Sequence, residues 1–314
     1  MTAQSSSLPL LTDDLSTPPL TLTQLAWLRL RRHKMALFGG IVLILLVLFS
    51  FGGSFLVTEK YANFNDTSQR LMPPSAEHLF GTDSIGRDIL ARTIYGGQIS
   101  LFIGFVAVLI ETILGILIGA LAGYYGGVVD AFLMRFTEAM LNIPTIFLLL
   151  VMAKFFGGKI PEIEIAGRVF SGSVIVIIVI IGATSWMYLA RIVRAEFLSL
   201  KEREFILAAR ATGTSNFEII FFHILPNTLA PIIVSSTLSV ANAILSEAYI
   251  SFLGMGVQPP TATWGNMLES SSKYLDSAPW LWFFPGMLIL LTTLSINFLG
   301  DGLRDALDPR SRTV

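Results

Sequence analysis

The sequence has no cysteine, only three histidines and little charge, and each shortage excludes a class of protein. Without cysteine the chain can form no disulfide, thiol nucleophile or cysteine-built metal site. Asp, Glu, Lys and Arg make up 14% of the 314 residues, whereas soluble domains hold about a quarter. The 21 basic residues are balanced by 22 acidic ones, so the basic surface of a nucleic-acid-binding protein is missing. With 53% hydrophobic residues, the composition predicts an integral membrane protein.

Sequence motifs for catalysis are missing as well. The one Gly-Lys pair, Gly158-Lys159, is followed by Ile160, so there is no G-x-x-x-x-G-K-[ST] sequence for binding phosphates. Neither H-E-x-x-H nor G-x-S-x-G occurs. The three histidines are widely separated in the sequence, which disfavours a histidine-built metal centre. We therefore expect no catalytic residue, no metal and no cofactor on this chain.

Six apolar segments are long enough to cross a bilayer, which takes about 20 residues of α-helix. Three of them carry no charge: residues 35–57, 169–190 and 279–300. The other three contain one or two charged residues: 99–124, 131–153 and 228–254. Pro144 interrupts the segment at 131–153. The prediction is an all-α integral membrane protein with six transmembrane helices.

Basic residues set the expected orientation of these helices. Arg29, Arg31, Arg32 and Lys34 directly precede the first span, and such residues favour the cytoplasmic side. An even number of spans returns the C-terminus to that side, with more lysine and arginine inside than outside. A cleavable signal peptide is the alternative for the first span. Its uncharged run is longer than the 7 to 15 residues of a typical signal core, which favours a retained helix.

The chain is expected to have three parts. Residues 1–22 are rich in Ser, Thr and Pro and show no helical period, as in a flexible cytoplasmic tail. Residues 23–98 would hold the first transmembrane helix and a large outer loop. Residues 99–312 would form the core, with the inner loop 191–227 between spans four and five.

That inner loop contains two short helices joined by a glycine. Residues 204–212 are mostly good helix formers, and Gly213 is suited to end the helix in a left-handed cap. Ser215 and Glu218 have the spacing of a capping box for a second helix. Pro226 is expected to break or bend the chain where the fifth span begins. The pattern predicts a compact helix–turn–helix knob, residues 204–226, on the cytoplasmic face.

The knob resembles the E-A-A-x-x-x-G-x(9)-I-x-L-P signature of the permease subunits of ABC importers. Five residues match it: Ala208, Ala209, Gly213, Leu225 and Pro226. Leu207 and His223 stand where the signature has Glu and Ile. Both departures are familiar in the peptide-importer branch, whose version resembles E-[FY]-x-x-A-A-R-A-x-G and H-I-L-P-N. An ordinary amphipathic loop helix would also account for this segment taken alone.

Three further segments resemble the same family. Residues 80–88 (FGTDSIGRD) are similar to its F-G-T-D-x-x-G-R-D sequence, and residues 251–265 to its S-F-L-G-L-G-V-Q-P-P…W-G sequence. Residues 299–310 (LGDGLRDALDPR) end the chain as members of the family do. The resemblance covers roughly residues 25–312. It indicates the C-type permease of a dipeptide, oligopeptide or nickel importer.

In that family the short cytoplasmic helix, here about residues 203–215, docks in a cleft of a separate ATPase subunit. The resemblance therefore implies a set of docking and coupling residues: Glu204, Ala208, Ala209, Arg210, Ala211, Gly213, Leu225 and Pro226. The alanines would allow close backbone approach. Arg210 would either pair with an acid on the ATPase or face solvent or lipid headgroups.

The resemblance also implies the rest of the complex: a second homologous permease, two ATP-binding subunits and an extracytoplasmic substrate-binding protein in a bacterial plasma membrane. ATP and magnesium would bind to the ATPase subunits. The motif at 80–88 is expected to be a structural turn and helix that braces the outer mouth and helps to receive the binding protein. Its five candidate residues are Gly81, Asp83, Gly86, Arg87 and Asp88.

Charged and small residues inside the spans give the remaining candidates. A charge at the centre of a bilayer is costly, so it should face protein or water. Glu111 and Glu247 are candidates for lining a passage, whereas Arg135 and Glu138 are spaced to pair with each other. A stripe of glycines repeats every four residues in the second span and predicts close helix packing: Gly115, Gly119, Gly123 and Gly127.

The predicted function is a non-catalytic permease subunit that couples ATP hydrolysis on other subunits to alternating access for short peptides. Nickel or another small solute is the first alternative substrate. An ion-coupled secondary transporter would need no ATPase and would leave the knob without a purpose. A membrane-embedded hydrolase would need a nucleophile or metal site, which three distant histidines do not supply.

Overall fold

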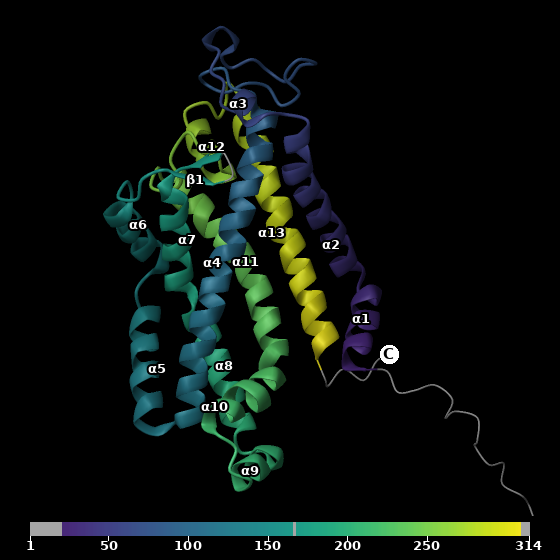
Figure 1. The fold of residues 1–314 in the computed structure, drawn as a ribbon. Helices are drawn as coiled ribbons and strands as arrows, with labels where there is room; N and C mark the ends of the chain where they lie inside the picture. The colour runs from purple at the N-terminus through teal and green to yellow at the C-terminus, as the bar shows by residue number, and fades with distance from the viewer. Residues whose placement is uncertain (1–20, 166–167, 309–314) are drawn as a thin grey trace, which may run out of the picture.

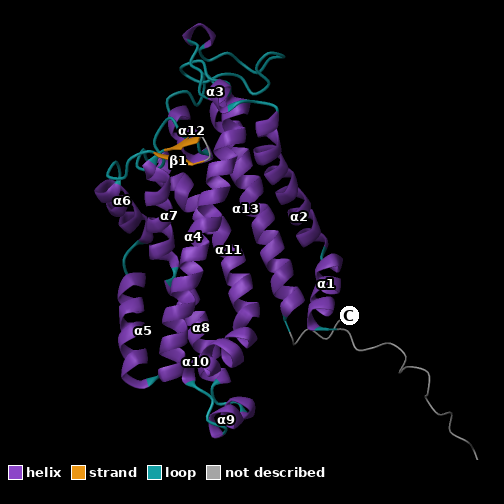
Figure 2. Ribbon diagram, viewed as in Figure 1, coloured by secondary structure: helices purple, strands orange, loops and turns teal. Residues whose placement is uncertain are grey.

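The computed structural model describes residues 21–165 and 168–308 and consists mostly of helices (Figures 1 and 2). The long helices run between an end that carries α3 and α12 and an end that carries α1 and α9. The predicted tail covers residues 1–22, of which residues 1–20 lie outside the described residues. Residues 309–312 of the predicted core also lie outside them.

The first span is preceded by a separate helix that was not predicted from the sequence. α1 (Leu22–Arg32) begins at a capping box formed by Thr21 and Gln24. His33 has extended backbone angles and separates α1 from the span. Three helical pieces make up that span: α2 (Lys34–Val47), a π-helical turn (Leu48–Gly52) and a 3-10 turn (Gly53–Phe55).

The second span begins earlier than predicted, because the outer motif caps it. α4 (Ile89–Tyr125) starts directly after Asp88, whose side chain accepts from the Ala91 N–H at 2.8 Å. The outer segment before it contains only two short helical pieces among the described residues: α3 (Glu59–Ala62) and a 3-10 turn (Thr67–Gln69). The predicted outer loop therefore ends at residue 88 and not at residue 98.

The segment predicted as the third span, residues 131–153, is not a single continuous helix. The chain forms α5 (Gly127–Leu141) and α6 (Thr145–Phe156), which are bent by 86° relative to each other. Pro144 lies between them and cannot donate a backbone hydrogen bond, and it disfavours helical angles at the residue before it. Figure 1 shows α5 and α6 along one side of the bundle.

The fourth span is also bent and starts later than predicted. The strand β2 (Arg168–Phe170), which pairs with β1 (Ile163–Ile165), occupies its expected beginning. α7 (Gly172–Ser185) and α8 (Met187–Leu200) follow, with an angle of 41° between them. Just before the bend, Thr184 donates to the Ile180 carbonyl at 2.7 Å, a back-bond that commonly bends helices.

The remaining helices form the knob, the last two spans and the segment between those spans. In chain order they are α9 (Glu204–Ala211), α10 (Asn216–Glu218), a π-helical segment (Ile219–Ile224), a 3-10 turn (Leu225–Thr228), α11 (Leu229–Phe252), α12 (Trp264–Ser271) and α13 (Trp280–Leu307). Within the described residues, four helices are long and apolar enough to cross a membrane, and six spans result if each bent pair is one span.

The core of the bundle is held by close contact between α4 and α8. A Cβ added at Gly119 would lie 2.5 Å from the Ala190 carbonyl oxygen, and one at Gly123 would lie 2.6 Å from the Phe197 Cβ. Gly115 faces Leu189 of α8 in the same way. The packing role of these three glycines agrees with the prediction. Gly127 differs, because it lies beyond α4 with a φ of +53°, and no atom of the described part of the chain lies within 4 Å of a Cβ added there.

Candidate coupling site and outer motif

α9 ends in the left-handed glycine cap that the sequence predicts. Gly213 has a φ of +82°, and its N–H donates to the Arg210 carbonyl at 3.0 Å. The Thr214 N–H donates to the Ala209 carbonyl at 3.1 Å, which completes a Schellman motif. Among the described residues, no neighbouring atom lies within 4 Å of a Cβ added at Gly213. Glycine is therefore favoured here by backbone conformation and not by lack of space.

The second half of the knob begins with the predicted capping box and then departs from α-helix. The Ser215 hydroxyl accepts from the Glu218 N–H at 3.3 Å, and the Glu218 carboxylate accepts from the Ser215 N–H at 3.0 Å. The π-helical and 3-10 segments follow, and Pro226 lies in the 3-10 turn. At Pro226 the helix changes type and then continues into α11. This effect is smaller than a break of the helix. Leu225 is half-buried against the knob's core.

One buried side chain anchors α9 to the membrane helices. Ile206 is 0% exposed and belongs to an apolar cluster that includes Phe197 of α8 and Ile219 and Ile224 of the π-helical segment. It is the only residue of α9 that is buried. This anchor was not identified from the sequence, where Ile206 is one apolar residue among several.

The opposite face of α9 is free within the described chain. Glu204, Ala208 and Ala211 recur at i, i+4 and i+7 and are exposed, so they lie opposite Ile206. Leu207 beside them is 48% exposed. We call these four residues the docking face. Figure 1 shows α9 projecting beyond the end of the bundle.

Arg210 lies on a different side of α9 and contacts the end of α4. Its guanidinium carbon is 5.4 Å from the centre of the Tyr124 ring, within the range of a cation–π interaction. The Tyr124 hydroxyl donates to the Asn216 side-chain oxygen at 2.6 Å. Tyr124 therefore ties both halves of the knob to α4. Tyr124 and Asn216 were also missed, because their pairing joins distant parts of the chain.

One ion pair joins two neighbouring helices at the same end, and a second lies within a single helix. Arg194 of α8 makes a bidentate pair with Asp130 of α5, a geometry that fixes relative orientation. Arg135 and Glu138 pair at 3.3 Å on the exposed side of α5, as their spacing predicts. The knob, α4, α5 and α8 are thus connected by packing, an aromatic hydroxyl and an ion pair.

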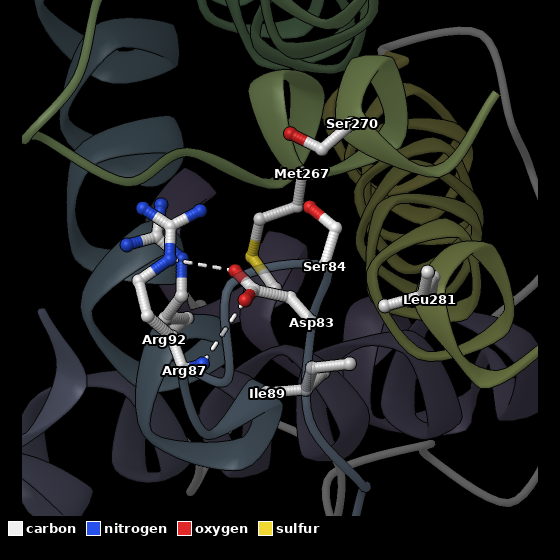
Figure 3. A pocket seen from close by; sticks show the side chains of 8 residues that line it. All are labelled: Asp83, Ser84, Arg87, Ile89, Arg92, Met267, Ser270 and Leu281. Atoms are coloured by element: carbon white, nitrogen blue, oxygen red, sulfur yellow. Dashed lines mark hydrogen bonds and ion pairs between the residues drawn. The ribbon is translucent and has the colours of Figure 1, made fainter. Parts of the chain in front are cut away.

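At the other end, the motif at 80–88 forms a tight turn (Figure 3). Asp83 accepts from the Arg87 side chain at 2.6 Å and from the backbone N–H groups of Ile85 and Arg87. Gly81 and Gly86 have φ of +76° and +83°, and Gly86 packs on the Asp66 carbonyl. Hydrogen bonds from the Ser68 hydroxyl and N–H hold the pKa of Asp66 below its usual value.

Asp88 connects the turn to α4 and to a buried histidine. Besides capping α4, it lies 2.8 Å from His78 Nδ1, and His78 Nε2 lies 3.0 Å from the Gln69 side-chain oxygen. His78 is 6% exposed. Partial burial, and then the charge of Asp88, raise the pKa of Tyr61 nearby. His78 had no recognisable signal in the sequence beyond its proximity to the motif.

A small cavity of about 20 Å³ lies behind this turn (Figure 3), room for about one water molecule. Asp83, Arg87 and Arg92 line it together with α12 and α13. Arg92 is 4% exposed and donates to the Asn63 side-chain oxygen at 3.0 Å. The turn is therefore packed between helices, and its five predicted residues are brought together in one place.

The two candidate passage residues lie between α4 and α11. Glu111 is 4% exposed and accepts from the Ser239 hydroxyl at 2.7 Å. Glu247 is 0% exposed and accepts from the hydroxyls of Ser251 and Ser100 at 2.7 and 3.2 Å. Both carboxyls face protein in this conformation. Their role in lining a passage stays a prediction.

Glu247 also supports the segment that follows α11. Ser100 Oγ, its partner, accepts from the Trp264 N–H at 3.1 Å, and Ser251 Oγ accepts from the Val257 N–H at 3.2 Å. Trp264 is 0% exposed.

Over residues 21–165 and 168–308, no group of three or more His, Asp or Glu side chains could hold a metal ion.

Comparison with known proteins decides the family. Residues 115–313 match the family described as binding-protein-dependent transport system inner membrane component, and residues 21–74 match the N-terminal transmembrane domain of oligopeptide transport permease C. The chain belongs to this permease family. It is therefore a multi-pass inner-membrane permease of an ABC importer, as the knob and the outer motif indicate.

Several relatives of this permease are similar over nearly its whole length. It is 41% identical to the dipeptide transport system permease protein DppC of Alkalihalophilus pseudofirmus, over 97% of this chain and 98% of that protein. It is 40% identical to DppC of Bacillus subtilis, over 96% and 89%. The oligopeptide permease OppC of Bacillus subtilis is 35% identical over 96% and 93%.

A solved structure has the same fold at lower sequence identity. A chain of the MetNI methionine ABC transporter in an inward-facing conformation aligns with a TM-score of 0.52 and 20% identity. The alignment covers 68% of this permease and 94% of that chain. At this identity the likeness concerns the fold alone.

Proposed function

We propose that this permease forms half of the translocation pathway for short peptides and receives mechanical force from an ATPase subunit at α9. The observation that carries the proposal is the two-sided geometry of α9. Ile206 fixes one side of the helix in the bundle, while the docking face on the other side is exposed and has small side chains at its centre. Because α9 is anchored in this way, a force applied to its docking face would move the bundle with it and would not bend α9 alone.

The proposed topology has both termini and the knob in the cytoplasm, with each bent helix pair counted as one of six spans. α1, with its basic residues, and α9 lie at the same end of the bundle (Figure 1), and basic residues favour the cytoplasmic side. The outer motif and α12 would then face the binding protein. The complex would contain a second permease and two ATPase subunits. No nucleotide would bind to this chain.

The proposed movement is a rigid-body rotation of helices around the knob. ATP-driven closure of the ATPase subunits would displace α9, and the cluster around Ile206 would carry that displacement to α8. Tyr124 and the Arg194–Asp130 pair would carry it to α4 and α5. Such rigid-body rearrangements are a common way to alternate access. This chain would supply the lever and no catalytic group.

Short peptides are the proposed substrate class because the relatives similar over the whole length are named as dipeptide and oligopeptide permeases. Nickel or another small solute is the alternative. Selection among these would rest mainly with the binding protein, so the permease residues are expected to tolerate several solutes.

Reconstitution tests this proposal. The permease, its partner permease, both ATPases and the binding protein would be placed in liposomes with a radiolabelled dipeptide. Uptake should require ATP and the binding protein, and omission of the ATPases should abolish it. Uptake by this chain alone, driven by an ion gradient without ATP, would instead establish a secondary transporter. ATP-dependent uptake of nickel but not of peptides would correct only the substrate.

A further inference from the structure

α1 has two faces that differ in their contacts. One face packs on the end of α13: the Arg29 side chain donates to the Asp308 carbonyl at 2.9 Å, and His33 Nε2 lies 3.5 Å from the Asp305 carboxylate. Leu30 of α1 lies against Gly302 of α13, and Ala36 of the following helix α2 lies against the same glycine. This face fixes α1 beside the C-terminal end of the last membrane helix, as Figure 1 shows.

The other face of α1 presents cations beside an exposed tryptophan. Trp27 and Arg31 are four residues apart and therefore adjacent on the helix surface, and Leu28 and Arg32 form a second such pair. Trp27 is 60% exposed and Leu28 37%. The side chains of Arg31 and Arg32 are exposed and make no ion pair with any residue in the described ranges 21–165 and 168–308.

The position of this face relative to the bilayer is set by the next helix. Lys34 begins α2, and an uncharged apolar run starts at Met35 and continues to the end of the span. His33 interrupts the helix, but four residues span at most about 14 Å even when fully extended, so Arg31 lies within that distance of the start of the run. Arg31, Arg32 and Lys34 are thus at the depth of lipid headgroups, where tryptophan is also favoured.

We propose that the exposed face of α1, with Trp27, Arg31 and Arg32, forms a binding surface for anionic phospholipid headgroups together with Lys34, the first residue of α2. The charge of the surface is complementary to a phosphodiester, and arginine binds phosphate oxygens with two parallel hydrogen bonds. The tryptophan ring lies beside the cations, where it can rest among the upper acyl carbons. Because the opposite face holds α13, a bound lipid would stabilise the α1–α13 contact.

The strength of this binding follows from the number of cations. Each Lys or Arg near an anionic membrane surface contributes about a fivefold gain in affinity, so three together contribute roughly 100-fold. A zwitterionic lipid such as phosphatidylcholine has no net charge and should gain little from the same surface.

The experiment compares the purified full chain with the triple variant Arg31→Gln, Arg32→Gln, Lys34→Gln in neutral detergent. Phosphatidylglycerol or phosphatidylcholine is titrated in, and thermal unfolding is followed at each concentration. A second triple variant removes three exposed lysines elsewhere on the chain as the matched control: Lys60→Gln, Lys154→Gln and Lys273→Gln. All three proteins should unfold alike in phosphatidylcholine, which shows that the variants fold.

Phosphatidylglycerol should stabilise the wild type and the control, and the α1 variant should need roughly 100-fold more of it for the same effect. Trp27→Phe should reduce the quenching of tryptophan fluorescence by brominated phosphatidylglycerol, because Trp27 is 60% exposed, and Trp282, 41% exposed, should retain part of it. Equal stabilisation of all three proteins would overturn the proposal. The test needs no transport partner and is independent of the proposed function.

Discussion

Replacing Ile206 by alanine should loosen α9 from the bundle without altering its docking face. Ile206 is 0% exposed and is the only buried residue of α9, so its truncation removes most of the helix's apolar anchor. Buried Ile→Ala substitutions cost about 2 to 5 kcal/mol, and an isolated helix of eight residues is unstable in water. A cost of about 2 kcal/mol raises the population of detached α9 roughly 30-fold.

Hydrogen exchange measured by mass spectrometry would report this detachment directly. The amides of α9 should exchange roughly 30-fold faster in Ile206→Ala, and those of α4 and α11 should not change. In the reconstituted complex, ATP hydrolysis should persist while peptide uptake per ATP falls. For the exchange measurement, Leu207→Ala is the matched control, because Leu207 is 48% exposed and its truncation should change folding by less than about 0.5 kcal/mol.

Unchanged exchange in α9 would refute the anchoring role of Ile206. Faster exchange together with normal uptake per ATP would refute a different step, namely that a firmly held α9 is needed to transmit force.

Three further substitutions test local features. Gly213→Val should cost about 1 to 2 kcal/mol in backbone strain and reduce uptake, whereas Gly213→Asn, which tolerates positive φ, should retain it in the same proteoliposome assay. Gly119→Val should force α4 and α8 apart and lower the thermal midpoint, because its Cβ would lie 2.5 Å from the Ala190 carbonyl oxygen; Leu117→Val on the exposed side of α4 should have little effect. Asp88→Ala should destabilise the outer end by at least about 2 kcal/mol through loss of the α4 cap and of the partner of His78, and Asp88→Asn, which can still cap, should cost less in thermal unfolding.

The local features of the knob were predictable because they depend on neighbours in sequence. The Gly213 cap and the Ser215–Glu218 box need only the residues within one turn, and both form as predicted. The anchor at Ile206 and the Tyr124–Asn216 bond could not be predicted in this way. Each joins segments that become adjacent only when α4, α8 and the knob pack together.

In the membrane helices, too, some features could be predicted from the sequence and others could not. Hydropathy located the apolar segments, because insertion depends on summed transfer free energy. It did not resolve the 86° bend at Pro144 or the 41° bend after Thr184, which depend on individual backbone hydrogen bonds. α1 was missed because its arginines suggested only a charged flank, although Thr21 and Gln24 form a cap. The glycine stripe predicted close packing but not its partner helix, α8.

Site-directed cross-linking at the docking face tests the central claim most directly. The native chain has no cysteine, so Ala208→Cys gives a single reactive thiol at an exposed position. In the assembled complex, a short bifunctional maleimide should join Ala208→Cys to an ATPase subunit carrying a cysteine in its cleft, and Ile85→Cys at the outer motif should give no such product. Absence of the Ala208→Cys product in a complex that still transports would contradict the proposal that α9 receives force from the ATPase.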